Sequence, residues 1–339
     1  MRCSTGAFAS AANWRIWLRL GRVSNLPTVW SNTVAGVCLG WAGLQSKLGG
    51  TQVVTHDFPG MAQLVLSMLA FSLIYVGGMF LNDAFDADID AKERPDRPIP
   101  AGIVSRRQVF IAGFALLVIG VLKVVAIATL FNDSSPLAAT LTATALAIMV
   151  VVYDMWHKNN PLSPLLMGIC RGLVYVTAAF IVTGIAIGSP LILGVVALLG
   201  YLIGLTAIAK QEHLQSLKSF WPLVLLFLPP MIALWLAAEF SAAVLVVIAL
   251  FALWIIYVVR TLAENKPGAI PRCVGMMIAA ISLVDMLMVA TVAVVGAVVV
   301  NPGDGMAVPG AETSLWVWAA FCFVCFGATL VLQRFVPGT

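Results

Sequence analysis

Long apolar stretches recur along this chain from residue 26 to residue 334. Each of ten stretches is about 20 residues long, the length that an α-helix needs to cross the hydrocarbon core of a bilayer. Only 10% of the residues are charged, against about 25% in an ordinary soluble domain, so the chain cannot cover a soluble surface. The sequence therefore predicts an all-α, polytopic transmembrane helical bundle of nine to ten spans. The ten stretches are residues 26–44, 61–82, 108–131, 136–153, 164–187, 189–209, 220–238, 241–261, 275–300 and 314–334.

The predicted bundle forms one domain. Residues 1–22 carry several arginines but no apolar segment like that of a cleavable signal peptide, so we expect a cytoplasmic N-terminal segment there. Residues 23–339 are expected to form a single transmembrane domain, because no internal repeat, low-complexity tract or long polar segment divides them. The six cysteines fall mostly in or beside apolar runs, and we interpret them as small packing residues.

Lysine and arginine are distributed unevenly between the two sides of the predicted membrane. With the N-terminus inside, 16 of the 19 fall in inside segments and Lys47 alone falls in an outside loop. Positive residues mark the cytoplasmic side of membrane proteins. We therefore expect an integral protein of the plasma (inner) membrane, with the N-terminus on the cytoplasmic side. The net charge of +4 reflects this orientation, and we expect no nucleic-acid partner.

One inside loop concentrates acids that this orientation does not explain. Asp86 and Asp90 follow Asn82 at i+4 and i+8, so a continuous helix would place the three side chains on one face. Mg²⁺ prefers one or two carboxylates, several waters and substrate phosphate oxygens. We therefore predict Asn82, Asp86 and Asp90 as ligands of Mg²⁺ bound to a diphosphate. The alternative is a solvated charged loop, which the regular spacing disfavours.

A stiff basic segment follows the acids. Three prolines and Gly102 end the helix and leave a loop that carries Lys92, Arg94 and Arg97. Guanidinium groups pair well with phosphate oxygens. Acids for a metal, followed by bases for phosphate, predict a diphosphate site at the membrane boundary. A lipid-linked diphosphate can reach such a site with its tail still in the bilayer.

The two segments together resemble the first signature of the UbiA family of membrane prenyltransferases. The residues that carry the resemblance are Asn82-Asp83-x-x-Asp86-x-x-x-Asp90, followed by Arg94-Pro-x-Arg97-Pro-Ile-Pro-x-Gly102. The resemblance covers roughly residues 15 to 265. It implies a helical bundle around a central cavity open to lipid. It also implies Mg²⁺-dependent transfer of a prenyl group from a prenyl diphosphate to a small-molecule or lipid acceptor.

The same resemblance assigns roles to further residues. Asn82, Asp86 and Asp90 would bind Mg²⁺–diphosphate, and Arg94 and Arg97 would contact phosphate, with Lys92 beside them.

A second element, Tyr153-x-x-x-His157-Lys158, is similar to the family's Tyr-x-x-x-Lys-Arg, which implies that Lys158 contacts diphosphate. Ordinary inside-loop charge is the alternative, and Asp154 is spaced to pair with Lys158 at i+4. Arg171 lies inside a span, where an ionisable group usually faces a polar interior. We predict that it binds diphosphate from the cavity wall. Snorkelling to the inside surface is equally compatible with its position.

The family's second acidic motif, Asp-x-x-x-Asp, is not present at its expected place. Residues 209–216 contain one acid, Glu212. In one reading Lys210 replaces the charge of a second Mg²⁺ and Glu212 orients it, so both join Asn82, Asp86 and Asp90 as candidate catalytic residues. In the other reading the chain is a non-catalytic membrane protein that binds or exports a lipid or a prenylated precursor.

Two further comparisons bear on these readings. The tenth span is a departure from the nine that are usual in the family. The altered second motif is similar to that of the family's divergent EboC-like branch. A phosphatidyltransferase that uses CDP-alcohols also has an acidic Mg²⁺ motif at a membrane surface. The Asp-Gly-x-x-Ala-Arg opening of that motif is absent here.

Overall fold

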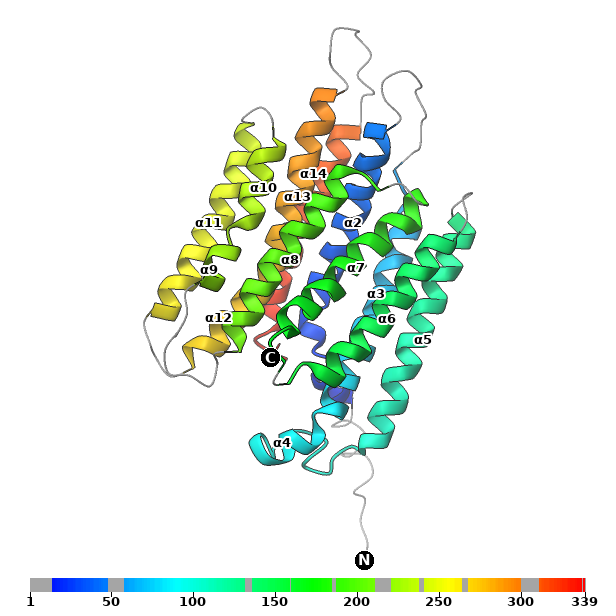
Figure 1. Cartoon of the computed structure of the whole chain (residues 1–339), viewed down its shortest axis with the longest axis vertical. Coiled ribbons are helices and arrows are strands. Elements are labelled where there is room, and N and C mark those ends of the chain that lie inside the picture. Colours follow the sequence, from blue (N-terminus) through cyan, green and yellow to red (C-terminus); the bar gives the residue numbers. More distant parts are fainter. Residues whose placement is uncertain are drawn as a thin grey trace, which may run out of the picture.

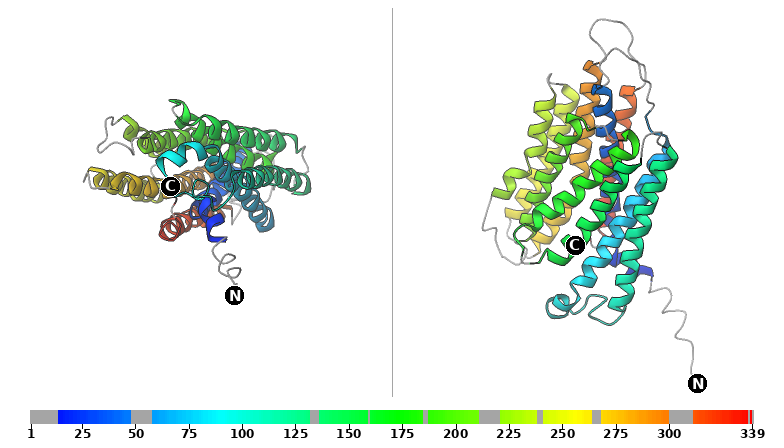
Figure 2. Two further views of the ribbon diagram at one scale, coloured as in Figure 1. Left: turned by 90° about the horizontal axis from the view of Figure 1, so that it is seen from below. Right: turned by 45° about the vertical axis from the view of Figure 1, so that its right-hand side comes forward.

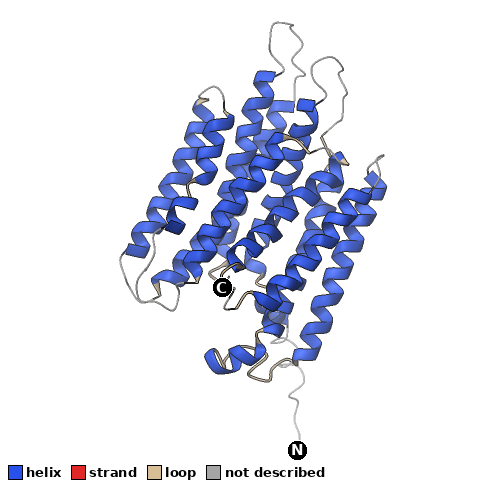
Figure 3. Cartoon of the chain, viewed as in Figure 1, coloured by secondary structure: helices blue, strands red, loops and turns tan. Residues whose placement is uncertain are grey.

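The computed structural model of this chain describes residues 14–47, 58–131, 136–158, 160–184, 187–210, 221–237, 241–263, 268–299, 311–336 and 338. Within these ranges every regular element is a helix, as Figure 3 shows. The long helices lie side by side along the long axis of one bundle (Figure 1). The predicted all-α architecture is therefore confirmed.

The helices follow one another without long excursions from the bundle. After the short 3₁₀ turn η1 (Val23–Asn25), they are α2 (Leu26–Lys47), α3 (Met61–Phe85), α4 (Ala87–Glu93), α5 (Arg106–Phe131), α6 (Leu137–Trp156), α7 (Ser163–Thr183), α8 (Ser189–Ala209), α9 (Trp221–Leu225), α10 (Leu228–Leu236), α11 (Ala242–Ala263), α12 (Ala269–Ala279), α13 (Ile281–Val299) and α14 (Ala311–Leu332).

Eight helical segments in the described part of the chain are long and apolar enough to cross a membrane. They are α3, α5, α6, α7, α8, α11, the consecutive pair α12–α13, and α14. The other two predicted spans correspond to α2 and to the shorter apolar pair α9–α10. The fifth and sixth predicted spans, which only Gly188 separates, are distinct helices. Gly184, with φ 71°, ends α7 before α8 begins.

The first span packs closely against α7. A Cβ atom on Gly36 would lie 2.6 Å from the backbone oxygen of Tyr175, and one on Gly40 would lie 2.5 Å from the Cβ of Ala179. Small residues allow such close approach between membrane helices, where packing and not the hydrophobic effect holds helices together. The paired helices α12–α13 contact both α2 and α14, and most of that span is buried.

The helices alternate in direction, so the predicted inside segments meet at one end of the bundle. The start of α2, the whole of α4, the end of α6 and the C-terminal end of the chain lie there (Figures 1 and 2). We call this end the α4 end. Asn25, the last residue of η1 before α2, donates its side-chain amide to the backbone oxygen of Gly338 at 3.0 Å. The first and last spans are therefore joined at the α4 end.

Candidate functional site

Four polar side chains of the predicted motif gather where α3 reaches the α4 end. Asn82 and Asp83 lie in the last turn of α3, Asp86 lies between α3 and α4, and Asp90 lies in α4. All four are buried, with at most 8% of each residue exposed. Charged groups are buried in proteins when they are paired or bind metals. This burial does not fit the alternative of a solvated charged loop.

The helix does not run straight through these residues, as the spacing alone suggested. It ends at Phe85 and resumes at Ala87, because Asp86 adopts a tighter turn with ψ −5°. The backbone amides of Ile89 and Asp90 both bond to the Asp86 carbonyl, at 2.9 and 2.8 Å. The first of these is the i→i+3 bond of a 3₁₀ turn. The four-residue spacing survives this turn, and α4 folds across the end of the bundle (Figure 1).

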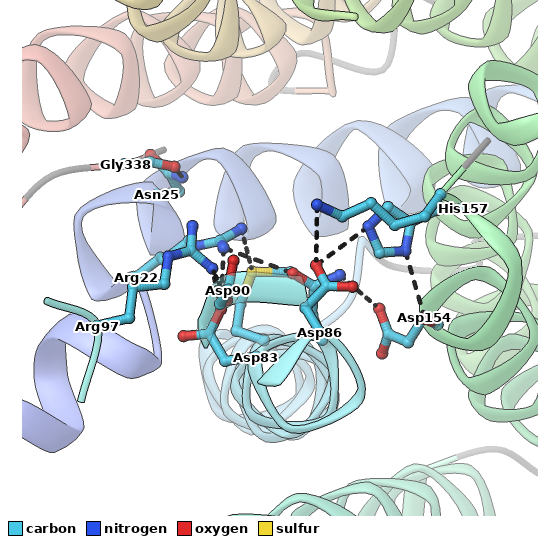
Figure 4. Close-up of polar contacts among 12 residues, drawn as sticks. Arg22, Asn25, Asp83, Asp86, Asp90, Arg97, Asp154, His157 and Gly338 are labelled. Carbon is cyan, nitrogen blue, oxygen red and sulfur yellow. Dashed lines mark hydrogen bonds and ion pairs between the residues drawn. The ribbon is translucent and has the colours of Figure 1, made fainter. Parts of the chain in front are cut away.

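Two arginines hold one side of the acid group. Nη1 of Arg97 lies 3.1 Å from Asp83 Oδ1 and 2.8 Å from Asp90 Oδ2. Arg22 precedes η1, and its Nη2 lies 3.2 Å from Asp83 Oδ1 and 3.5 Å from Asn82 Oδ1. Burial by itself would lower the pKa of the Arg22 guanidinium, but Asp83, with smaller contributions from Tyr75, Tyr153 and Asp154, raises that pKa above its ordinary value. Figure 4 shows both arginines beside Asp83 and Asp90.

Asp86 faces a different set of bases. Its Oδ2 lies 3.3 Å from His157 Nε2 and 3.9 Å from Lys158 Nζ. The His157 ring stacks on Tyr153, with centroids 5.1 Å apart, and Lys158 also lies 3.9 Å from Glu93. The predicted second element therefore meets the acidic motif directly, on the side away from the two arginines (Figure 4).

Asp154, in the last turn of α6, adds another buried acid. It is 3% exposed, and its Oδ1 accepts a hydrogen bond from Asn82 Nδ2 at 3.2 Å. The expected pair with Lys158 does not form, because Lys158 reaches Asp86 and Glu93 instead. The other carboxylate oxygen, Oδ2, is buried without a hydrogen-bond partner among the described residues. An unpaired buried carboxylate oxygen is costly, so the position favours a cation.

The donor set suits a divalent cation such as Mg²⁺, which takes oxygen ligands and keeps several waters. In the described contacts, Asp83, Asp86 and Asp90 each meet their basic partners through one carboxylate oxygen, and the second oxygen of each remains for a metal. No three acidic, histidine or cysteine side chains in the described ranges are close enough to enclose an ion. A cation here would therefore have fewer than three such ligands, with water and phosphate oxygens completing its shell.

Two more predicted diphosphate ligands lie in and after α4. Lys92 is exposed in the last turn of that helix, and Arg94 follows its end, with its backbone amide 2.8 Å from the Asp90 carbonyl. A cleft of about 130 Å³ at Arg94 is lined by Arg19, Leu20, Arg22, Asp83, Arg94, Asp96, Arg97 and Pro98. The predominance of basic groups in this lining suits a phosphate.

The predicted second half of the site is only partly described. Lys210 directly follows α8, and its Nζ donates to the backbone oxygen of Asn160, in the loop that also carries Lys158. Burial lowers the pKa of Lys210. Glu212 lies outside the described residues, so the roles of Lys210 and Glu212 as candidate catalytic residues stay predictions.

Arg171 is set apart from the acidic motif. Its Nη1 donates to Asn32 Oδ1 at 2.7 Å and its Nη2 to Thr28 Oγ1 at 3.2 Å. The guanidinium lies over the Tyr75 ring, 5.6 Å from its centroid. These partners belong to α2 and α3, so the side chain points into the bundle, which does not fit snorkelling to the surface. Tyr75 in turn lies 3.4 Å from the carbonyl of Arg22. A role for Arg171 in diphosphate binding stays a prediction.

Comparison with models of protein families identifies the family of this chain. The model described as the UbiA prenyltransferase family matches residues 46–281, more than half of the chain. The chain belongs to the UbiA prenyltransferase family. The resemblance that the acidic and basic segments carry is therefore confirmed, and the bundle is an integral membrane protein of that family.

Relatives of the UbiA chain agree with this membership. It is 39% identical over 99 residues to the digeranylgeranylglyceryl phosphate synthase of Methanothrix thermoacetophila, over 29% of this chain and 34% of that protein. It is 28% identical over 116 residues to the protoheme IX farnesyltransferase of Aliivibrio salmonicida, over 34% of this chain and 38% of that protein. These matches span a little over a third of each relative.

A solved structure supports the fold. The apo structure of a UbiA homolog from Aeropyrum pernix K1 superposes with a TM-score of 0.52 at 20% identity, covering 75% of this chain and 98% of that chain. At this identity the likeness concerns the arrangement of helices alone.

Three residues of this UbiA chain were missed as parts of a polar network by reasoning from the motif. Arg22 looked like ordinary inside charge, although it lies directly before the first span. The i+4 spacing of Asp154 predicts a local pair with Lys158, and Asp285 is the one charged residue in the apolar stretch 275–300. In the structure Asp285 is bound by Asn32 and Tyr175. The available indication was the presence of Asn32 and Asp285, two strongly polar residues, within otherwise apolar spans.

Proposed function

We propose that this UbiA-family protein transfers a prenyl group from a prenyl diphosphate to an acceptor within the membrane, in a Mg²⁺-dependent reaction. The observation that carries the proposal is the contact of Arg97 with both Asp83 and Asp90. It brings Arg97, which would bind phosphate, and Asp90, which would bind the metal, together at the end of the bundle. An isolated structural ion pair would not require three buried acids and two half-buried arginines together.

Some of the candidate residues would bind the cation, and others would bind the phosphate groups. Asn82, Asp86 and Asp90 would hold Mg²⁺, which when bound neutralises negative charge on the diphosphate oxygens. Arg94 and Arg97 border the basic cleft and would bind phosphate oxygens through paired N–H donors. Lys158, 3.9 Å from Asp86, is placed to add a point charge next to the acids. Binding a diphosphate would thus exchange carboxylate partners of these bases for phosphate oxygens.

The reaction breaks the bond between the first prenyl carbon and the diphosphate oxygen. The electron pair leaves with diphosphate, so negative charge develops where the basic side chains lie, and fixed positive groups there lower the barrier. The allylic carbon then forms a bond to a nucleophilic atom of the acceptor, which loses its proton. The apolar helices around the prenyl tail exclude water and so disfavour hydrolysis.

The site is further proposed to face the cytoplasm. The segments rich in lysine and arginine lie at the α4 end, and such residues mark the cytoplasmic side. The prenyl tail would lie among the spans, while the diphosphate would lie at the aqueous, cytoplasmic end of the bundle. The acceptor is a membrane lipid or a small molecule that reaches the same depth.

A second candidate function is supported by one observation. Residues 209–216 supply a single acid, Glu212, where the UbiA pattern expects two. A site that holds a diphosphate but does not ionise it would suit a protein that binds or exports a lipid or a prenylated precursor.

Pyrophosphate release separates the two functions. Purified protein is supplied with Mg²⁺ and prenyl diphosphates of several lengths, and released pyrophosphate is measured with and without membrane lipid extract as the acceptor source. Transfer predicts release that depends on Mg²⁺ and that Asp86→Ala abolishes. Binding of the prenyl diphosphates without release, under every condition, would favour the export function.

A matched control uses the same loop. Asp88 lies two residues from Asp86, but its side chain is 82% exposed and pairs with Arg106. Asp88→Ala removes the same charge at the same end of the bundle and should leave pyrophosphate release within about twofold of the unmodified protein. Glu212→Gln then shows whether the single acid after α8 contributes.

A further inference from the structure

The UbiA chain has a buried acid that neither the motif nor the proposed mechanism uses. We propose that Asp154 is a ligand of a divalent cation that binds together with the diphosphate, and that it supplies carboxylate charge that residues 209–216 lack. This inference rests on the proposed function in one respect, because the cation is the one that accompanies diphosphate. It adds a ligand from α6 to a site otherwise built from α3 and α4.

The first support is the state of the carboxylate. Asp154 is 3% exposed, its Oδ1 accepts from Asn82, and its Oδ2 is buried with no hydrogen-bond partner in the described ranges. Buried carboxylate oxygens are almost always paired with donors or cations. An oxygen left without either, next to a predicted metal ligand, is a position for a cation.

The second support is the contrast with the neighbouring acids. Asp83 and Asp90 each have an arginine, and Asp86 has His157 and Lys158. Within the described part of the chain, no basic side chain forms an ion pair with Asp154. His157 contacts it only through the backbone oxygen, at 3.3 Å from Nδ1.

The third support is position. Figure 4 shows Asp154 and Asp86 on the same side of α3, with Arg22 and Arg97 on the other side. A cation on the Asp154 side would therefore meet Asp86 and Asp154 without displacing either arginine. Asn82 would join them when its amide turns, because its Nδ2 now faces Asp154 and its Oδ1 faces Arg22. One amide and two carboxylates, completed by water and diphosphate oxygens, match the ligands that Mg²⁺ uses beside phosphates.

The competing explanation is that Asp154 only orients Asn82 through its hydrogen bond. Asp154→Asn distinguishes the two, because an asparagine retains an oxygen that accepts from Asn82 and loses the charge. Binding of Mn²⁺ to purified, metal-free protein is measured by electron paramagnetic resonance in the presence of inorganic pyrophosphate. The proposal predicts that Asp154→Asn weakens Mn²⁺ binding about tenfold or more, or lowers the number of ions bound. Binding within twofold of the unmodified protein, with the same number of ions, would overturn it.

A change of metal preference tests direct ligation and remains informative if Asp154→Asn does not fold. Thiolates prefer soft metals, so Asp154→Cys should shift pyrophosphate-linked binding toward Cd²⁺ over Mn²⁺ by about tenfold. An unchanged preference for Mn²⁺ over Cd²⁺ would overturn the proposal. The unmodified protein is measured alongside, so that any Cd²⁺ bound by its own cysteines is subtracted.

Two controls separate this inference from the proposed function. Asp88→Asn, on the exposed side of α4, should leave Mn²⁺ binding unchanged and so excludes a general effect of charge at the α4 end. Asp86→Asn should abolish pyrophosphate-linked Mn²⁺ binding. If Asp86→Asn binds normally, the proposed diphosphate site is wrong. If Asp86→Asn fails and Asp154→Asn binds normally, only the role of Asp154 is wrong.

Discussion

Asn32 donates its side-chain amide to both carboxylate oxygens of Asp285, at 2.9 Å each. The hydroxyl of Tyr175 donates to the same carboxylate, and Asn32 Oδ1 accepts from Arg171 at 2.7 Å. Asp285 is 0% exposed. A charged group so deep in an apolar bundle is tolerated only because these donors surround it. The network joins α2, α7 and α13.

Removing this carboxylate should destabilise the bundle. In Asp285→Ala, the amide of Asn32 and the hydroxyl of Tyr175 lose their acceptor and stay buried, at a cost of about 1–3 kcal/mol each. Asp285→Asn keeps one acceptor oxygen and should lose less. Denaturant titration of the purified protein in one detergent measures the free energy of unfolding. An alanine variant as stable as the unmodified protein would show that the network does not stabilise the fold.

Metal removal should stop the reaction and leave the fold intact. Arg22 and Arg97 already neutralise Asp83 and Asp90, so the acids do not need an ion to stay buried. We expect a chelator to abolish pyrophosphate release, and added Mg²⁺ to restore it. The midpoint of thermal unfolding without diphosphate should be the same with chelator and with Mg²⁺. A large loss of stability in the chelator would mean that the metal is structural.

Arg97 should matter more for its shape than for its charge. Its guanidinium bridges two carboxylates, and a lysine cannot reproduce that fork. Loss of a charge-assisted hydrogen bond corresponds to roughly 10- to 100-fold in affinity. We expect Arg97→Gln to weaken binding of Mg²⁺–pyrophosphate by about that factor, and Arg97→Lys to recover only part of it, as measured by calorimetry. Arg107→Gln, an exposed position in α5, should bind as the unmodified protein does.

Labelling of a single cysteine can determine on which side of the membrane the site lies. The five cysteines in the described part of the chain are buried, and Cys3 is first replaced by serine. Asp88→Cys then places an exposed thiol on α4. An impermeant maleimide should label it in inside-out membrane vesicles and not in intact cells. Labelling of intact cells would put the α4 end outside and reverse the proposed topology.

The periodic apolar runs predict the spans well because length and composition alone determine whether a helix can cross a bilayer. The predicted run 61–82 and α3, Met61–Phe85, begin at the same residue. Sequence could not predict the turn at Asp86, because it depends on where α4 packs against the end of the bundle. Likewise the division of one apolar run into α12 and α13 depends on packing around Ala280.

The candidate site was likewise predictable from the sequence in one part and not in another. Local spacing predicted that Asn82, Asp86 and Asp90 gather at one place, because residues four apart stay close through a helical turn. It could not assign their partners, since Arg22 and His157 come from segments far away along the chain. Proximity in the sequence predicted the wrong partner for Asp154. Its carboxylate, on α6, accepts a hydrogen bond from Asn82 on α3 and does not pair with Lys158.

Gly40, where α2 meets α7, lies roughly 20 Å along the helix from the start of α2. A larger side chain there has no free space, because a Cβ would already lie 2.5 Å from Ala179. The helix would tilt as a stiff rod, and its far end carries Asn25 and, directly before η1, Arg22. The position of Arg22, which binds Asp83, therefore depends on the contact between α2 and α7 in the opposite half of the bundle. Inactive variants of this protein should therefore include substitutions at the α2–α7 contact that leave every polar residue in place.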